Sequence, residues 1–231
     1  MFPTRLTIAA ALIAAPVLVR ANEVPKAYPS FDQDRAATAI VVARVSAGGE
    51  LPDFPQCNRP QVICLHVPFW FKAHVLQTMA GKVDEPVLNV STESHDSMKS
   101  YVREPSTQLL RLKLHDGQAY LPLYEFRRLY TRRDGELYLV LTGGRLPDWL
   151  PCSAPDLSEP IVGSDFSPDL SREPDEDTGM WEDTEVARHP EIWRIEADRA
   201  WPRNGIRIAR LREMMRGLAA RNEPTDCRTA R

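Results

Sequence analysis

Alternating apolar and polar residues over the middle of the chain predict a series of short β-strands. Residues 38–45 (TAIVVARV) form a β-branched run typical of a buried strand. Residues 62–77 form a longer and strongly β-like run, in which Pro68 indicates a bulge or an edge position. Residues 86–92 (PVLNVST) predict a further short strand.

Two hairpins follow, each with an Asp-Gly turn signal. The turns fall at Asp116-Gly117 and Asp134-Gly135, and Asp-Gly between alternating segments is a strong indicator of a tight hairpin. The strands flanking these turns are expected at residues 109–114, 118–126, 127–131 and 136–142. Six or seven strands at this spacing predict a mainly β fold, either a small antiparallel barrel (OB-like) or a sandwich.

The chain changes character after this β region. Residues 156–185 contain eleven acidic residues and a single basic one, Arg172. Such a segment buries too little apolar surface to offset its ordering entropy, so residues 153–187 are expected to form an extended, partly mobile linker. Phe166 and Trp181 are its candidates for contact with the β domain.

Two helices are expected after the linker. Pro190 suits a first helical position and would open a helix over residues 191–200. Residues 204–220 carry an apolar stripe at helical spacing, surrounded by arginines. The predicted organisation is therefore a signal peptide (1–21), a β domain (22–152), an acidic Pro-containing linker (153–187) and a C-terminal helical appendage (188–231).

The assignment of residues 1–21 as a signal peptide comes from their charge and hydropathy pattern. Arg5 precedes an uncharged apolar run over residues 6–19, and a small-residue pattern follows at Ala21. The run is shorter than the roughly 20 residues of a spanning helix, although an uncleaved N-terminal anchor is the alternative. Cleavage would leave a periplasmic or secreted protein without a transmembrane segment.

Net charge bears on the class of partner. Without Arg5 and Arg20, the mature chain has 27 basic and 32 acidic residues, a net charge of about −5. Nucleic-acid binders normally show a basic excess, so nucleic acid is not an expected partner. The expected partner is another envelope or extracellular protein, and the oligomeric state is left open.

All four cysteines lie after the predicted signal peptide, at Cys57, Cys64, Cys152 and Cys227. An even count in an exported chain favours disulfides, and four cysteines allow three pairings. We favour Cys57–Cys64 and Cys152–Cys227. The spacings lack the paired CxxC pattern of zinc sites, so no metal and no cofactor is expected.

One segment carries the residue types of a hydrolase. His95, Asp96 and Ser97 could supply a base and a nucleophile. Adjacency in sequence does not indicate a triad, because triad members meet in space. A polar loop after a strand is the favoured interpretation, and a small secreted hydrolase using His95 is the alternative function.

Four further residues are candidates for binding. Trp70 and Trp149 could form an exposed apolar patch or groove. Arg207 and Arg210 belong to the arginine-rich C-terminal helix, which could contact a partner or an anionic headgroup. Internal neutralisation by the acidic linker is the competing interpretation of the same arginines.

The β region resembles a known family over residues 38–142. The residues that carry the resemblance are 39–45 (AIVVARV), 71–82 (FKAHVLQTMAGK) and 86–90 (PVLNV). They are similar to the bacterial OB-fold domains related to tissue-inhibitor-of-metalloproteinase and netrin modules. The resemblance implies a barrel. It does not imply metalloproteinase inhibition, because those inhibitors begin with a mature Cys and the expected first residue here is Asn22.

The function predicted from these observations is non-enzymatic binding in the cell envelope. An inhibitor or immunity-type role fits the size and the compartment. Besides the hydrolase, the alternative is an envelope assembly component that binds a partner through its arginine-rich helix.

Overall fold

The fold is described from a computed structural model. It describes residues 24–26, 28, 35–52, 66–94, 106–141, 146–166, 186, 189–196 and 199–228. The described chain is mainly β with a C-terminal helix, which confirms the predicted fold class. Within the described residues, no helix combines the length and the apolar composition needed to cross a membrane.

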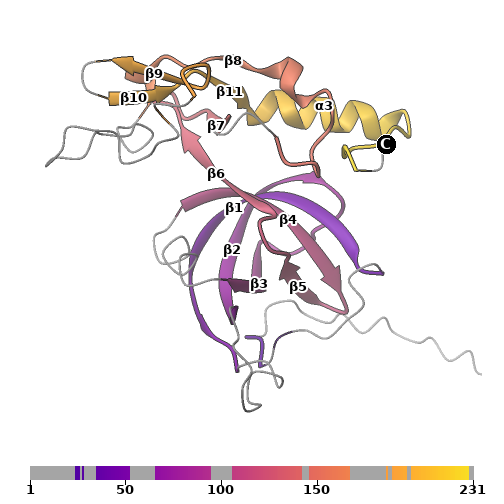
Figure 1. Ribbon diagram of the computed structural model, residues 1–231. Helices are drawn as coiled ribbons and strands as arrows, with labels where there is room; N and C mark the ends of the chain where they lie inside the picture. The colour runs from indigo at the N-terminus through magenta and orange to yellow at the C-terminus, as the bar shows by residue number, and fades with distance from the viewer. Residues whose placement is uncertain are drawn as a thin grey trace, which may run out of the picture.

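Five strands close a β-barrel (Figure 1). They are β1 (Ala37–Glu50), β2 (Val67–Ala80), β3 (Val87–Ser94), β4 (Ser106–His115) and β5 (Gln118–Leu121). Their order is β1-β2-β3-β5-β4, and an antiparallel pairing of β4 with β1 completes the ring. All pairs are antiparallel except β3 with β5, which run parallel.

Alternate residues of all five strands fill the barrel interior. Those most deeply buried include Val41, Phe71, Val90, Leu112 and Leu121. On β1, Ile40 and Val42 point the other way and join a second cluster outside the barrel. Because β1 is buried on both faces, its sequence is a continuous apolar run rather than an alternating one.

Both predicted hairpins are present. His115 pairs with Gln118 across a two-residue turn, in which Asp116 and Gly117 have φ of 45° and 73°. Positive φ at both central positions is the geometry that Asp-Gly sequences favour. Gly135 also has a positive φ, of 90°, in the turn between β6 (Phe126–Thr131) and β7 (Leu137–Val140).

A second layer, which we name the cap, packs against the outside of the barrel and lies above it in Figure 1. It consists of β6, β7, β8 (Glu159–Pro160), β11 (Asn204–Arg207) and α3 (Ile208–Ala220). β6 belongs to both layers, since it pairs with β4 at one end and with β7 at the other. β11 then lies between β7 and β8.

An apolar cluster joins the cap to the barrel. The barrel contributes Ile40, Val42 and Leu109, and α3 contributes Leu211 and Met215. The helical stripe predicted over residues 204–220 is therefore correct in its buried face. Its first four residues, however, form strand β11.

The helix expected over residues 191–200 is wrong. The chain there forms a two-stranded hairpin, β9 (Trp193–Glu196) with β10 (Arg199–Pro202). Trp193 and Ala200 are buried in a small cluster of their own. Residues 199–202 alternate between half-buried and buried, the two-residue period of a strand, and this tertiary burial outweighs the helix-start signal of Pro190.

The linker expected over residues 153–187 is wrong in its first part. Residues 154–157 form the 3-10 turn η2 (Ala154–Leu157), and residues 163–165 form η3 (Gly163–Asp165). Ala154, Ile161 and Phe166 are buried against the cap, so this stretch is packed despite its acidic residues. Trp181 and most of the rest of the expected linker lie outside the described residues.

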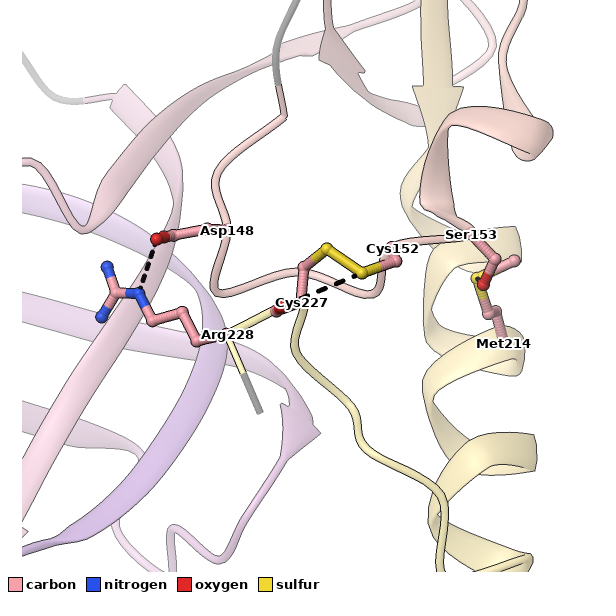
Figure 2. The surroundings of a disulfide bond; sticks show 6 residues. All are labelled: Asp148, Cys152, Ser153, Met214, Cys227 and Arg228. Atoms are coloured by element: carbon pink, nitrogen blue, oxygen red, sulfur yellow. Dashed lines mark hydrogen bonds and ion pairs between the residues drawn. A yellow bond between two sulfur atoms is a disulfide. The ribbon is translucent and has the colours of Figure 1, made fainter. Parts of the chain in front are cut away.

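Cys152 and Cys227 form a disulfide, with their Cα atoms 4.7 Å apart, which confirms this pairing. It joins the chain after the β domain to the segment that follows α3 (Figure 2). Cys57 and Cys64 lie outside the described residues, so their pairing stays a prediction.

Candidate binding face on strands β1 to β3

A row of directly opposed residues crosses the outer surface of the barrel. Gly49 of β1 pairs with Trp70 of β2, Trp70 with Ser91 of β3, and Ser91 with Tyr120 of β5. The sequence neighbours of Trp70 and Tyr120, together with Val90 beside Ser91, point into the barrel, so Trp70, Ser91 and Tyr120 point outwards. Residues directly opposite one another in a sheet are in side-chain contact.

Trp70 lies over the backbone of β1. A Cβ atom built at Gly49 would lie 2.9 Å from Trp70 Nε1, so the indole occupies the space that a side chain there would need. A Cβ at Gly48 would collide with the Trp70 carbonyl. The Gly48-Gly49 pair thus permits a close approach that leaves Trp70 half-buried.

Basic side chains lie beside Trp70 on the same strands. Lys72 and His74 of β2 are exposed, and they pair with Ser46 and Arg44 of β1. The His74 Nε2 atom lies 3.4 Å from Ser46 Oγ. We call Arg44, Ser46, Trp70, Lys72 and His74 the basic face.

Across β3, the surface becomes covered and mixed in charge. Tyr28 stacks edge-on against Tyr120, with ring centroids 5.5 Å apart. Burial, together with a hydrogen bond to Tyr120, holds the pKa of the Tyr28 phenol well above its ordinary value. Nearby, His66 Nδ1 lies 3.6 Å from the Glu93 carboxylate. Among the residues that the structure describes, the open part of the barrel surface is therefore the β1 and β2 side, where the basic face lies.

The structure places the two candidate tryptophans differently. Trp70 is half-buried on the barrel surface, whereas Trp149 is only 2 % exposed and lies in the core between the barrel and the cap. The expectation that Trp149 forms an exposed binding patch is therefore wrong. Both tryptophans have apolar neighbours, Phe71 for Trp70 and Leu150 for Trp149, so the sequence pattern did not indicate which of the two would face solvent.

Arg207 and Arg210 are engaged within the chain. Arg207 Nε donates to Glu159 Oε1 at 2.5 Å, and Arg210 lies 3.4 Å from the other carboxylate oxygen. Glu159 belongs to the segment expected to be an acidic linker, so at this residue the acidic and arginine-rich segments neutralise each other. Farther along the helix, Arg216 is exposed.

Tyr138 completes this cluster, which sequence reasoning missed. Its hydroxyl donates to Glu159 Oε1 at 2.6 Å and accepts a hydrogen bond from Arg132 at 3.1 Å. Burial, followed by the hydrogen bond to Glu159, raises the pKa of Tyr138 to about 12. Burial alone would raise the pKa of Glu159, but the hydrogen bonds from Tyr138 and Arg207 outweigh it and hold that pKa below its ordinary value.

His95, Asp96 and Ser97 lie outside the described residues, so the hydrolase alternative stays a prediction. Within the described ranges, no group of three or more His, Cys, Asp or Glu side chains is arranged to hold a metal ion. Comparison of the chain with family models, curated proteins and solved structures found no match.

Proposed function

We propose that the chain is an exported, non-enzymatic binding protein of the cell envelope, and that its basic face contacts an acidic protein partner. The observation that carries the proposal is the position of half-buried Trp70 beside exposed Arg44 and Lys72, on a chain whose formal net charge is −3. Aromatic and Arg side chains are enriched at protein interfaces, where they supply much of the binding energy.

Charge geometry supports an acidic partner. Arg44 lies directly opposite His74 on the neighbouring strand, and Lys72 is two residues away on the same face. Arg44 and Lys72 are diagonal neighbours on β1 and β2, because Lys72 pairs with Ser46. Like charges on neighbouring strands repel, and a bound carboxylate would offset that repulsion. Such a surface steers an oppositely charged partner towards Trp70.

The relationship to inhibitor-related OB-fold domains is part of the proposal. It is supported by the closed five-stranded barrel and by the location of Trp70 and Ser91 on its second and third strands. In OB folds the face made by these two strands is a binding surface. An inhibitor or immunity-type role would use this surface.

Periplasmic or secreted localisation is supported by the apolar run at residues 6–19 and by the Cys152–Cys227 disulfide, since disulfides persist in oxidising compartments. N-terminal sequencing of the protein recovered from the envelope or the medium is expected to begin at Asn22. A product that begins at Met1 and stays in the cytosol would contradict this part of the proposal.

Photocrosslinking in the producing cells tests the basic face. A photoreactive residue at position 72 is expected to give a discrete protein adduct, which Trp70→Ala or Arg44→Glu should weaken. Position 82 is the matched control, because Lys82 is also an exposed lysine but lies in the turn after β2, paired with Asp84. Equal adducts at both positions, or none at position 72, would refute binding through this face.

A further inference from the structure

The chain after α3 turns back and contacts the loop that follows β7. Asn222 adopts a φ of 56°, and the Glu223 amide donates to the Leu218 carbonyl at 2.9 Å. This left-handed residue ends the helix and reverses the chain. The following residues then reach the loop that precedes η2.

Three kinds of contact hold this returning segment. The amide of Cys227 donates to the carbonyls of Asp148 and Leu150 at 2.9 and 3.0 Å, and the Arg228 amide donates to Asp148 at 3.2 Å. Arg228 Nε also lies 2.8 Å from the Asp148 carboxylate (Figure 2). The third contact is the disulfide between Cys152 and Cys227.

Arg228 connects the segment to a buried charge. Its guanidinium lies 3.0 Å from Glu125 Oε1, and the Glu125 side chain is only 8 % exposed. Arg111 of β4 donates to both oxygens of the same carboxylate at 2.7 Å. Glu125 thus has one arginine from the barrel and a second from the C-terminal segment.

The disulfide between Cys152 and Cys227 is accessible to solvent. Cys152 is exposed and Cys227 is half-buried. Arg228 itself is 45 % exposed, and ion pairs of exposed side chains contribute little to stability. Without the disulfide, a few backbone hydrogen bonds and these ion pairs would have to offset the ordering entropy of the returning segment.

We propose that residues 221–228 and the Cys152–Cys227 disulfide form a redox-operated clasp, which a dithiol reductant opens while the barrel stays folded. A thiolate of the reductant attacks one sulfur, the Cys152–Cys227 bond breaks, and the other cysteine leaves as a thiolate. The second thiol of the reductant resolves the mixed disulfide. The protein gains two electrons and two protons, and the dithiol becomes a disulfide.

Opening leaves the rest of the molecule supported. Glu125 keeps its contacts with Arg111, so no buried carboxylate is left uncompensated. Leu211 and Met215 still anchor α3 in the apolar cluster. The barrel interior receives no residue from the returning segment. Reduction therefore frees Arg228 and its neighbours without removing core contacts.

Hydrogen exchange of the full chain, oxidised and after treatment with dithiothreitol, tests the clasp. The Cys227 and Arg228 amides are expected to exchange about 100-fold faster after reduction, whereas those of Val41 and Leu112 keep their rates. Mass mapping of alkylated cysteines identifies which bond was reduced. A Cys152→Ser/Cys227→Ser variant, left without reductant, should reproduce the same pattern.

Three outcomes would overturn the proposal. The first is unchanged exchange at Cys227 and Arg228 once alkylation shows both Cys152 and Cys227 to be reduced. The second is an equal loss of protection in β1 and β4, which would show that the Cys152–Cys227 disulfide stabilises the whole fold. The third is a bond that dithiothreitol does not reduce under native conditions.

Discussion

The barrel and the cap are stabilised by different means. The barrel interior consists of apolar side chains from five strands. The cap shares an apolar cluster with the barrel, but its outer contacts are ionic: Glu159 with Arg207, and Arg132 with Glu136. The loop after β7 is likewise held to the C-terminal segment by Asp148 with Arg228. Apolar burial is insensitive to pH and redox state, so the two layers should respond differently to both.

The largest expected effect is in the barrel interior. Phe71 is 1 % exposed, and Phe71→Ala should lower the free energy of unfolding by about 3–5 kcal/mol through lost burial and a cavity. Urea unfolding followed by circular dichroism measures this. Leu76→Ala is the control on the same strand, since Leu76 is 58 % exposed and its loss should change stability little. Similar losses for both variants would contradict the description of the interior.

The next effect is at the buried ion pair between Arg111 of β4 and Glu125. Glu125→Gln keeps the shape of the side chain but leaves Arg111, which is 11 % exposed, without its counter-charge. We expect a loss of about 3 kcal/mol, because breaking one side of a buried pair leaves an uncompensated charge. Glu223→Gln, which removes an exposed partner of Arg221, should have a far smaller effect in the same urea titration. Wild-type stability of the Glu125 variant would refute this ranking.

A smaller effect concerns alkaline pH. The pKa of Tyr138 is raised to about 12, by burial first and then by its hydrogen bond to Glu159. A phenol with a raised pKa in the folded state stabilises fully below its unfolded pKa of about 10, and this stabilisation is lost as pH rises towards 12.

Thermal or urea unfolding between pH 9 and 12 should therefore show a steeper loss of stability in the wild type than in Tyr138→Phe, on the order of 1–2 kcal/mol. Tyr124→Phe is the control, because Tyr124 is 60 % exposed. Parallel profiles for the wild type and Tyr138→Phe would show that Tyr138 is not held neutral by the cap.

The smallest expected effect separates the two arginines bound to Glu159. Arg210 is 51 % exposed and lies 3.4 Å from the carboxylate, whereas Arg207 donates a hydrogen bond at 2.5 Å. Arg210→Ala should change stability by less than about 0.5 kcal/mol, and Arg207→Ala by about 1 kcal/mol or more. A larger loss for Arg210→Ala in urea unfolding would reverse this assignment.

The barrel was predictable because its signals are local. Apolar runs and Asp-Gly turns report strands and hairpins within a few residues of where they occur, as at Asp116-Gly117. The hairpin at residues 193–202 was missed because its strands are short and Pro190 imitates a helix start. Trp193 and Ala200 are buried in one cluster because the chain folds back on itself there, and a helix over residues 191–200 would not bring the two side chains together.

For the charged contacts of the cap, the attraction between two segments was predictable, but the individual residue pairs were not. The sequence shows an acidic segment and an arginine-rich segment, and hence a mutual attraction. It does not show that Glu159 is the residue bound by Arg207, 48 residues later, or that Glu125 meets Arg228, 103 residues later. On the basic face, the Gly48-Gly49 pair was an available sign of a close approach, whereas the pairing of Arg44 with His74 depends on the register of β1 and β2.

Acid should loosen the cap before the barrel, because carboxylates in the cap and in the loop that follows β7 have lowered pKa values. The hydrogen bond from Arg228 lowers that of Asp148, and the hydrogen bond from Arg132 lowers that of Asp134 to about 2. A carboxyl group with a lowered folded pKa stabilises the native state above its unfolded pKa of about 4. That stabilisation is lost as pH falls towards 2.

Residue-resolved hydrogen-exchange protection factors, measured on the oxidised chain at neutral pH and between pH 4 and 2, test the contrast between the layers most directly. We predict that Leu139 and Ile206 in the cap lose protection with acid, whereas Val41 and Leu112 in the barrel keep theirs. An equal loss in both layers, or a barrel that loosens first, would contradict the account.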